Sequence, residues 1–270
     1  NEIMTYIVFI FGSYLLGSIP TGLTISKWVK GVDIRDFGSG NTGMANVIRT
    51  VGILPGILVL LLDVSKGLIP ILLIGIISDR TPSSLGFEDS LVISCGFATL
   101  IGHTWSIFLK FKGGKGVATG MGTLIALSPI SFIVGAAIAL PTIAIWRYMS
   151  VASLIGAIFG GLTLAILSIF GPYPLSWSLY GVIGPLIITI RHRENIERLR
   201  LRTESKIGQP LWVEPPLPGV TPPTTTVHIE QLVPREIHLR GLSNPAQLAE
   251  SFDLLKPTSS PNAYKTLRPD

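Results

Sequence analysis

Long apolar segments, separated by short polar ones, dominate this sequence. Several of them contain the roughly 20 apolar residues that an α-helix needs to cross a hydrocarbon core about 30 Å thick. Only 14% of the 270 residues are charged, whereas a soluble domain carries about 25%. The mean hydropathy of the chain is +0.56. These features exclude an ordinary soluble domain and predict an all-α polytopic membrane protein.

We expect seven transmembrane helices, one of them short. They cover residues 3–26, 51–78, 90–109, 117–146 (two helices), 150–170 and 176–190. The stretch 117–146 exceeds one span, and Ser128-Pro129 divides it, because proline removes a backbone hydrogen bond and clashes with the preceding turn.

Lysine and arginine lie almost entirely on one side of these spans. That side holds Lys27, Lys30, Arg35, Arg49, Lys110, Lys112, Lys115, Arg147 and the arginine-rich stretch from Arg191. Arg80 is the only such residue in the segments on the other side. Because positively charged loops stay in the cytoplasm, we expect the N-terminus outside and the three polar loops and the C-terminal tail in the cytoplasm.

The composition changes after Lys206, where a run of prolines begins at Pro210 and would interrupt any helix. We therefore expect a membrane domain over residues 1–206 and a partly disordered cytoplasmic tail over 207–270, whose partner the sequence does not identify. Within the tail, residues 227–239 are compatible with a short extended pair. Asn244-Pro245 is typical of the start of a helix, which would run through Leu255.

The sequence lacks the usual signs of a metal or cofactor site. Its single cysteine, Cys95, cannot form a disulfide or a cysteine-rich metal site within one chain. The four histidines form no HxxxH or HExxH pair. The net charge of +5 is concentrated beside the membrane. We therefore expect no metal, no cofactor and no nucleic-acid partner.

The first polar loop carries glycines and short polar side chains, Gly38-Ser39-Gly40-Asn41-Thr42-Gly43, followed by Asn46 and Arg49. If the residues after Gly43 are helical, Asn46 and Arg49 share a face at i, i+3. Arginine suits bidentate contact with phosphate. Taken alone, however, the run favours a simpler interpretation, a turn before the second span with Arg49 reaching lipid headgroups.

The second polar loop, residues 111–119, contains three glycines and two lysines, Lys112 and Lys115. Its glycines allow successive backbone N–H groups to face one concavity and bind an anion. A helix that starts at Val117 would add its positive end at the same place. The run is not a Walker A loop, which needs a glycine at the position of Leu109 and Ser or Thr after the lysine. Turns of this composition at membrane boundaries are also common as purely structural features.

The third polar segment is residues 191–198. On a helix, His192 and Asn195 share a face, and a histidine is able to move a proton or stabilise a polar transition state near neutral pH. The alternative is a juxtamembrane basic segment that holds anionic lipid.

Two charged residues lie inside the second span. Asp63 and Lys66 are one helical turn apart in a setting where unpaired charge is costly. We favour an internal ion pair with a folding role over the lining of a substrate cavity. His103 and Trp105, at the end of the third span, are expected to be structural, the tryptophan as part of an interface belt.

All three polar segments fall on the same predicted side of the membrane. A transporter would tend to place its polar site near the midplane of the bilayer. Polar groups gathered at one surface instead suit a reaction between a water-soluble anion and a partner carried in the lipid.

These segments resemble the bacterial acyl-phosphate:glycerol-3-phosphate acyltransferases of the PlsY type, over about residues 5–205. The resemblance rests on GSIPTG (17–22), the run 33–49, LDVSKG (62–67), FKGGKGVAT (111–119) and RHRENIERL (191–199). It implies a membrane enzyme that transfers a fatty acyl group from acyl phosphate to the 1-hydroxyl of glycerol 3-phosphate. The products would be lysophosphatidate and phosphate, at the start of phospholipid synthesis.

The resemblance also implies roles for single residues. The residues expected to be catalytic are Ser39, Arg49, Lys115, His192 and Asn195. Those expected to bind phosphate groups are Gly38, Gly40, Asn41, Gly43, Asn46, Lys112, Gly113, Gly114 and Gly116. Glu194 is expected to be structural. The chain departs from the family pattern at Met44-Ala45, at Ser106 and in its long tail, which leaves open an added regulatory or docking function.

We expect direct attack of the hydroxyl on acyl phosphate, with Ser39 donating a hydrogen bond to phosphate. An ester on Ser39, activated by His192, is the alternative mechanism. Two alternative functions are a phosphate or organophosphate transporter and a lipid-binding scaffold.

Overall fold

The structure, a computed structural model, describes residues 2–77 and 88–209. Within these stretches the α-helices, in order, are α1 (Glu2–Ser18), α2 (Thr21–Lys30), α3 (Met44–Thr50), α4 (Ile53–Ile77), α5 (Glu88–Thr104), α6 (Val117–Leu127), α7 (Pro129–Trp146), α8 (Met149–Phe170), α9 (Trp177–Arg191) and α10 (Arg193–Arg200). Short 3₁₀ turns cover Ile34–Asp36 and Ile107–Leu109. The all-α class is confirmed for these residues. The expected elements of the tail, at 227–239 and 244–255, lie outside them.

Among the described residues, five helical stretches are long and apolar enough to cross a membrane. They are Ile3–Lys30, Ile53–Ile76, Asp89–Leu109, Pro129–Trp146 and Met149–Phe170. α6 and α9 are apolar but shorter. At about 1.5 Å per residue, the 11 residues of α6 rise only about 17 Å. The five long stretches match five predicted spans, whereas the count of seven and the orientation stay predictions.

Two of the spans are interrupted as helices. Within the stretch Ile3–Lys30, which contains the predicted span 3–26, α1 ends at Ser18 and α2 begins at Thr21. Pro20 explains the break, since it lacks an N–H and disfavours a helical conformation for the residue before it. The third stretch, Asp89–Leu109, reaches residue 109 as predicted, but within it α5 ends at Thr104 and a 3₁₀ turn covers Ile107–Leu109.

The predicted division of the stretch 117–146 is confirmed. α6 ends at Leu127 and α7 begins at Pro129, with Ser128 as the N-cap residue. The Ser128 hydroxyl oxygen accepts a hydrogen bond from the Ser131 backbone N–H at 3.3 Å, which satisfies one of the free donors at the start of α7.

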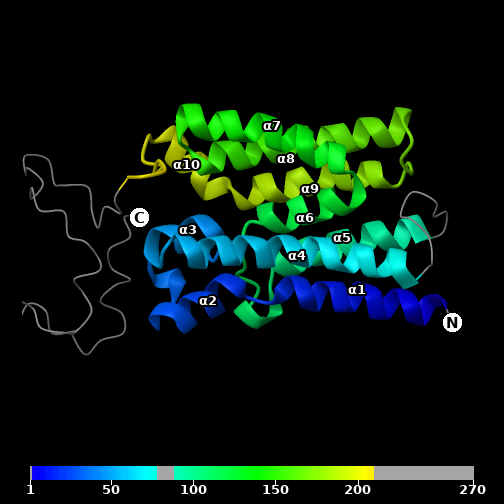
Figure 1. Ribbon diagram of the computed structural model, residues 1–270, viewed down its shortest axis with the longest axis horizontal. Helices are drawn as coiled ribbons and strands as arrows, with labels where there is room; N and C mark the ends of the chain where they lie inside the picture. The colour runs from blue at the N-terminus through cyan, green and yellow to red at the C-terminus, as the bar shows by residue number, and fades with distance from the viewer. Residues whose placement is uncertain (1, 78–87, 210–270) are drawn as a thin grey trace, which may run out of the picture. The chain divides into compact units, whose positions relative to one another are not determined.

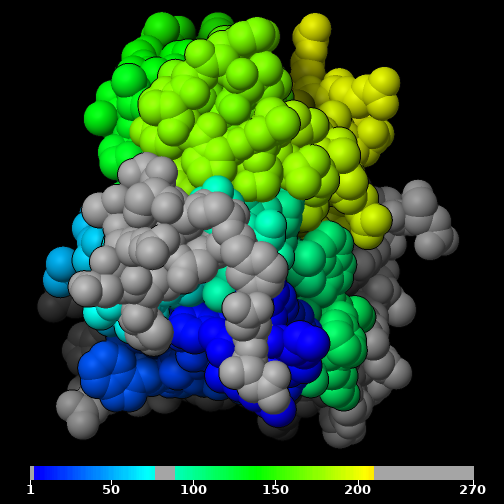
Figure 2. All heavy atoms as spheres, turned by 90° about the vertical axis from the view of Figure 1, so that its right-hand side faces the viewer, coloured from blue at the N-terminus to red at the C-terminus, as the bar shows by residue number. Residues whose placement is uncertain are grey.

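The long helices pack side by side into a bundle (Figure 1). Seen from one end, α1 and α8 lie on opposite sides with α5 between them (Figure 2). α4 and α6 approach so closely that a Cβ at Gly122 would lie 1.9 Å from the Val64 carbonyl oxygen, and one at Gly67 would lie 2.0 Å from that of Thr119. Only glycine fits at such contacts. They hold α6 firmly on α4, and therefore hold the loop that leads into α6.

The short helices gather at one end of this bundle. α2, α3 and α10 all lie at the end shown on the left of Figure 1. Hydrogen bonds join the second and third polar segments there, and Arg49 of the first segment donates to the Ser205 carbonyl, just beyond the third. This end of the bundle is therefore the candidate site.

Candidate active site

Asn46 organises the first polar loop. This side chain, in α3, is 2% exposed, and its Nδ2 donates to the backbone carbonyls of Ile34, Phe37 and Asn41 at 2.9–3.1 Å. Its Oδ1 accepts from the Ser39 backbone N–H at 3.1 Å. The polar atoms of Asn46 are therefore used within the loop. Its predicted contact with phosphate is not tested by these bonds and stays a prediction.

The rest of this loop is shaped by its turns. Gly38 and Gly40 have φ angles of +57° and +65°, in the left-handed region that favours glycine. The Asn41 Oδ1 accepts from the Gly43 backbone N–H at 3.0 Å. Ser39 is held between these glycines with its side chain exposed. The loop thus presents the Ser39 hydroxyl at the surface.

The second polar loop is clamped from two sides. The backbone N–H groups of Gly113 and Gly114 donate to the Thr104 and His103 carbonyls at 3.1 and 2.9 Å. The Arg191 guanidinium donates to the carbonyls of the same two glycines at 3.1 and 3.3 Å. These N–H groups therefore cap the end of α5 rather than face an open concavity. The capping thus satisfies two carbonyls that are left without helical partners where α5 ends at Thr104.

The remaining part of the loop turns into α6. Gly116 is the N-cap residue of α6 and has a φ angle of +83°. A helix begins directly after Lys115 and Gly116, so its partial positive charge lies beside Lys115. The expectation of an anion site in this loop now depends on Lys115 and the first turn of α6, and stays a prediction.

Lys115 is the first link in a chain of three side chains. Its Nζ donates to Asn195 Oδ1 in α10. Asn195 Nδ2 donates to Glu204 Oε1 at 2.7 Å, so the amide of Asn195 is held in one orientation. Glu204 also accepts from Ser150 Oγ at 2.6 Å and from Arg198 Nε at 2.7 Å. The carboxylate thus fixes the amide that in turn fixes the lysine.

Electrostatics around Lys115 favour an approaching anion. Burial lowers the pKa of Lys115 from its ordinary value to about 8, with the cations of Arg198 and Arg49 acting in the same direction. The carboxylates of Glu204 and Glu194 oppose this change. Lys115 is therefore still mostly cationic at pH 7, but it is poorly hydrated and close to other cations. A bound phosphate group would supply hydrogen-bond acceptors to the poorly hydrated ammonium and a negative charge that offsets the neighbouring cations.

His192 lies at the junction of α9 and α10 and is 2% exposed. Its Nδ1 is 2.8 Å from the Ile188 carbonyl oxygen. A carbonyl only accepts, so Nδ1 carries the proton and Nε2 is left as an acceptor. Burial lowers the pKa of His192 to about 4, opposed by the Ile188 hydrogen bond and assisted by the charge of Lys115. His192 is therefore neutral at pH 7.

Arg49 brings the first loop to the other two. Its Nη2 donates to the Ser205 carbonyl at 3.4 Å, and its pKa is lowered by burial. Through these contacts the structure gathers Arg49, Lys115, His192 and Asn195 at one end of the bundle. In the described part of the chain, Ser39 has no hydrogen bond to any of these four. Lys112 is exposed on the second loop.

Sequence reasoning missed Glu204 and Ser150. Neither lies in a recognisable motif. Glu204 is a single acid after an arginine-rich helix, and Ser150 is a single serine in the first turn of an apolar one. The spacing of Glu194 and Arg198 would allow a pair within α10, but Arg198 pairs instead with Glu204. The predicted ion pair of Asp63 and Lys66 is confirmed, with Nζ to Oδ1 at 2.6 Å.

A bundle of membrane-spanning helices, with clustered cations and a neutral histidine at one end, defines an integral membrane protein that is suited to acting on a phosphate compound. A family model described as glycerol-3-phosphate acyltransferase matches residues 7–202. The chain belongs to the glycerol-3-phosphate acyltransferase family, and the resemblance noted in the sequence is thereby confirmed.

Curated relatives and solved structures agree with this assignment. The chain is 44% identical to a glycerol-3-phosphate acyltransferase of Geotalea daltonii over 199 residues, which are 74% of this chain and 96% of the relative. It is 40% identical to one of Halalkalibacterium halodurans over 200 residues, 74% of this chain and 94% of the relative. The crystal structure of PlsY, described as an integral membrane glycerol 3-phosphate acyltransferase in its glycerol 3-phosphate form, has a TM-score of 0.67 and 36% identity. The match covers 76% of this chain and 96% of the PlsY chain.

Proposed function

We propose that this protein transfers a fatty acyl group from acyl phosphate to the 1-hydroxyl of sn-glycerol 3-phosphate. The products are 1-acylglycerol 3-phosphate and inorganic phosphate, and the reaction takes place at the cytoplasmic face of the cell inner membrane. A related crystal structure of PlsY is described as its lysophosphatidic acid form, which is consistent with this product. The observation that carries the proposal is the gathering of Arg49, Lys115, His192 and Asn195 at one end of the bundle.

Both substrates carry phosphate, so they repel each other. Two unit charges 4 Å apart interact by about 4 kcal/mol at an effective dielectric constant near 20. Lys115 and Arg49 are both partly buried, which reduces screening of their charge by solvent. Cations in this position offset the repulsion and hold the two phosphates near each other.

The donor reaches the site from the bilayer. Burying a chain of about fifteen methylenes is worth on the order of 12 kcal/mol, at ~0.8 kcal/mol per CH₂. The acyl chain therefore stays among the lipid tails, which also cover the exposed apolar side chains of the bundle, such as Leu54 and Leu61 of α4. Glycerol 3-phosphate is water-soluble and arrives from the cytosol. A site at one end of the bundle suits both routes.

The neutral His192 suits a hydrogen bond from the attacking hydroxyl. Its Nε2 is left as the acceptor, because Nδ1 donates to Ile188. A group whose pKa is about 4 is too weak a base to store the proton at pH 7. The hydroxyl oxygen forms a bond to the acyl carbon, the bond from that carbon to the phosphate oxygen breaks, and the proton ends on the released phosphate. His192 then orients the hydroxyl during attack.

Ser39 is assigned a hydrogen-bond role toward phosphate rather than a nucleophilic one. Nucleophilic serines are activated by a base within hydrogen-bond reach, and the structure describes no hydrogen bond between Ser39 and His192. An acylated peptide that contains Ser39, trapped by rapid quench during turnover, would contradict this assignment.

The direct test supplies the purified full-length protein with palmitoyl phosphate and radiolabelled glycerol 3-phosphate. Lysophosphatidate is expected to form, and palmitoyl-CoA is not expected to replace the donor. Lys115→Ala should abolish the product, whereas Arg200→Ala, which removes a cation at the end of α10, should not. Arg200 is exposed and lies on α10, and among the described residues its ion pair is a long one, to Glu197 at 3.9 Å.

A second arm separates an enzyme from a transporter. The protein in proteoliposomes, without acyl donor, is expected to leave labelled glycerol 3-phosphate outside. Uptake without lysophosphatidate formation would refute the proposed function. So would a purified, folded protein that forms no lysophosphatidate under any of these conditions.

A further inference from the structure

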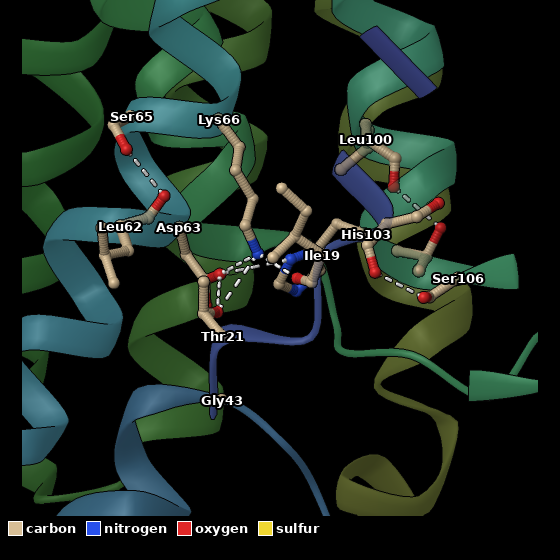
Figure 3. A network of polar contacts seen from close by, with 12 residues as sticks. Ile19, Thr21, Gly43, Leu62, Asp63, Ser65, Lys66, Leu100, His103 and Ser106 are labelled. Carbon is tan, nitrogen blue, oxygen red and sulfur yellow. Dashed lines mark hydrogen bonds and ion pairs between the residues drawn. The ribbon is translucent and has the colours of Figure 1, made fainter. Parts of the chain in front are cut away.

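A buried polar cluster lies behind the candidate site, where the chain breaks between α1 and α2 (Figure 3). The Lys66 ammonium donates to the Ile19 carbonyl at 2.6 Å, to Asp63 Oδ1 at 2.6 Å and to Thr21 Oγ1 at 3.1 Å. All three donors of the ammonium are therefore used. The side chains of Lys66 and Asp63 are 4% and 2% exposed. This cluster fastens α4 to the break between α1 and α2.

His103 extends the cluster to α5. Its Nδ1 lies 3.7 Å from Asp63 Oδ1, the oxygen that also contacts Lys66 and Thr21. The ring is buried and points toward the ion pair in Figure 3. One edge of the imidazole therefore rests on the Asp63–Lys66 pair.

The Nε2 end of the ring touches the loop that carries Lys115. A Cβ added at Gly114 would lie 2.2 Å from His103 Nε2, so the ring occupies the space that any side chain at position 114 would need. The Gly114 backbone N–H also donates to the His103 carbonyl. From the other side, Arg191 donates to the carbonyls of Gly113 and Gly114. The two glycines are therefore fixed between His103 and Arg191.

We propose that His103 is a positioning residue for Lys115: its ring, resting on the Asp63–Lys66 pair, supports the Gly113–Gly114 turn and thereby sets where the lysine ammonium lies. The sequence alone suggested only a structural histidine. The contacts give it a defined effect on one group of the site, and this inference rests on the proposed function only for the role of Lys115 in turnover.

If the support is removed, Lys115 should become better hydrated. Burial is the main cause of its lowered pKa, so a looser loop should raise that pKa toward the ordinary lysine value of ~10.4. The charged groups that also act on Lys115 are Arg49 of α3, Glu194 and Arg198 of α10, and Glu204 in the segment that follows. None of them is altered in the variants below.

Two variants separate the contacts made by the two ring nitrogens of His103. His103→Asn keeps a polar atom near the Nδ1 position, toward Asp63, but removes the edge that faces Gly114. His103→Gln reaches the Nε2 position and keeps that edge. Leu91→Ala is the matched control, because Leu91 is equally buried in the same helix but near its other end. Gly114→Ala makes the same test from the loop side, since its Cβ would displace the ring.

The measurement is the rate at which acetic anhydride labels Lys115, followed by mass spectrometry across pH 6 to 11 in the full-length protein. The labelling rate rises with pH as the ammonium loses its proton, and for the unaltered protein the midpoint of this rise is expected near pH 8. In His103→Asn and Gly114→Ala it should rise by about one unit toward ~10.4. His103→Gln, which keeps the contact to Gly114 but loses the one to Asp63, should raise it less, and Leu91→Ala should leave it in place. An unchanged midpoint in folded His103→Asn would overturn the proposal, and so would an equal rise in Leu91→Ala.

This labelling needs no substrate, so it separates the two proposals. A shifted midpoint in a protein that makes no lysophosphatidate would support the positioning role and refute the proposed function. Normal acyl transfer with no shift of the labelling midpoint in any His103 or Gly114 variant would support the proposed function and refute the positioning role. Where both hold, the loss of activity at high pH should move upward with the labelling midpoint.

Discussion

Replacing Glu204 with glutamine tests the chain of contacts that orients Asn195 and Lys115. The carboxylate accepts hydrogen bonds from three donors, Ser150 and Asn195 at Oε1 and Arg198 at Oε2. Glutamine offers one oxygen in place of two. Whichever way its amide turns, an NH₂ group faces a donor, and at least one of these bonds is lost.

The size of the effect follows from the bonds involved. A hydrogen bond to a charged group contributes about 1.5–3 kcal/mol, and the Glu204 side chain is only 8% exposed, so little of this is lost to solvent screening. If the loss is expressed in the transition state, kcat/KM should fall by about 10- to 100-fold.

The pH dependence should change in a definite direction. The Glu204 carboxylate raises the pKa of Lys115, which burial and neighbouring cations bring down to about 8. Without that negative charge the pKa of Lys115 should fall further, so the ammonium loses its proton at a lower pH. Since the cation is the form that binds phosphate, the decline of kcat/KM on the basic side should move to lower pH.

The assay is lysophosphatidate formation from palmitoyl phosphate, with kcat/KM measured from pH 6 to 10. Glu197→Gln is the control, because Glu197 is a glutamate on α10, seven residues before Glu204, but is exposed and 3.9 Å from Arg200. Activity within twofold of the unaltered protein at every pH, or an equal fall in Glu197→Gln, would refute the reasoning.

Three further predictions concern stability and turnover. Asp63→Asn leaves the buried Lys66 ammonium without its counter-charge and should lower the free energy of unfolding by about 3–5 kcal/mol. The double change Asp63→Leu with Lys66→Met should cost less, as measured by thermal unfolding in detergent, and a larger cost for the double change would contradict this. Gly116→Ala should cost about 1–2 kcal/mol and raise the KM for glycerol 3-phosphate, because its φ is +83° and the new Cβ would lie 2.5 Å from Leu100 Cδ1; an unchanged melting temperature and KM would argue against it. His192→Ala should lower kcat by about 100-fold through loss of hydroxyl orientation, and full turnover in single-turnover kinetics would exclude that role.

Hydropathy predicted where most helices lie, because crossing a bilayer imposes a length and a composition that are local in sequence. The break at Ser128-Pro129 followed from proline chemistry and is confirmed. The break before Thr21 carries the same signal in Pro20, but hydropathy predicted a span over 3–26 without indicating this break. The capping of α5 at Thr104 could not be predicted from the local sequence, since Gly113 and Gly114 donate to carbonyls nine or more residues earlier.

The motifs marked the three polar segments, but the pairings between them are non-local. Lys115 and Asn195 are 80 residues apart, and Arg49 and Ser205 are 156 apart. No periodicity within either segment indicates which partner it meets. Glu204 was missed for a related reason, because a single acid after a basic helix has no signature of its own.

The segment 203–207 is fastened to several parts of the bundle at once. Arg147 donates to the Ile207 carbonyl at 2.6 Å, Arg49 to that of Ser205 at 3.4 Å, and the Lys206 backbone N–H donates to Gln209 Oε1 at 2.8 Å. These ties continue past Lys206, where the amino-acid composition first changes. A shortened version intended for crystallisation, or a fusion to a reporter, should therefore keep every residue through Gln209, since an earlier stop would remove hydrogen bonds that hold the segment carrying Glu204.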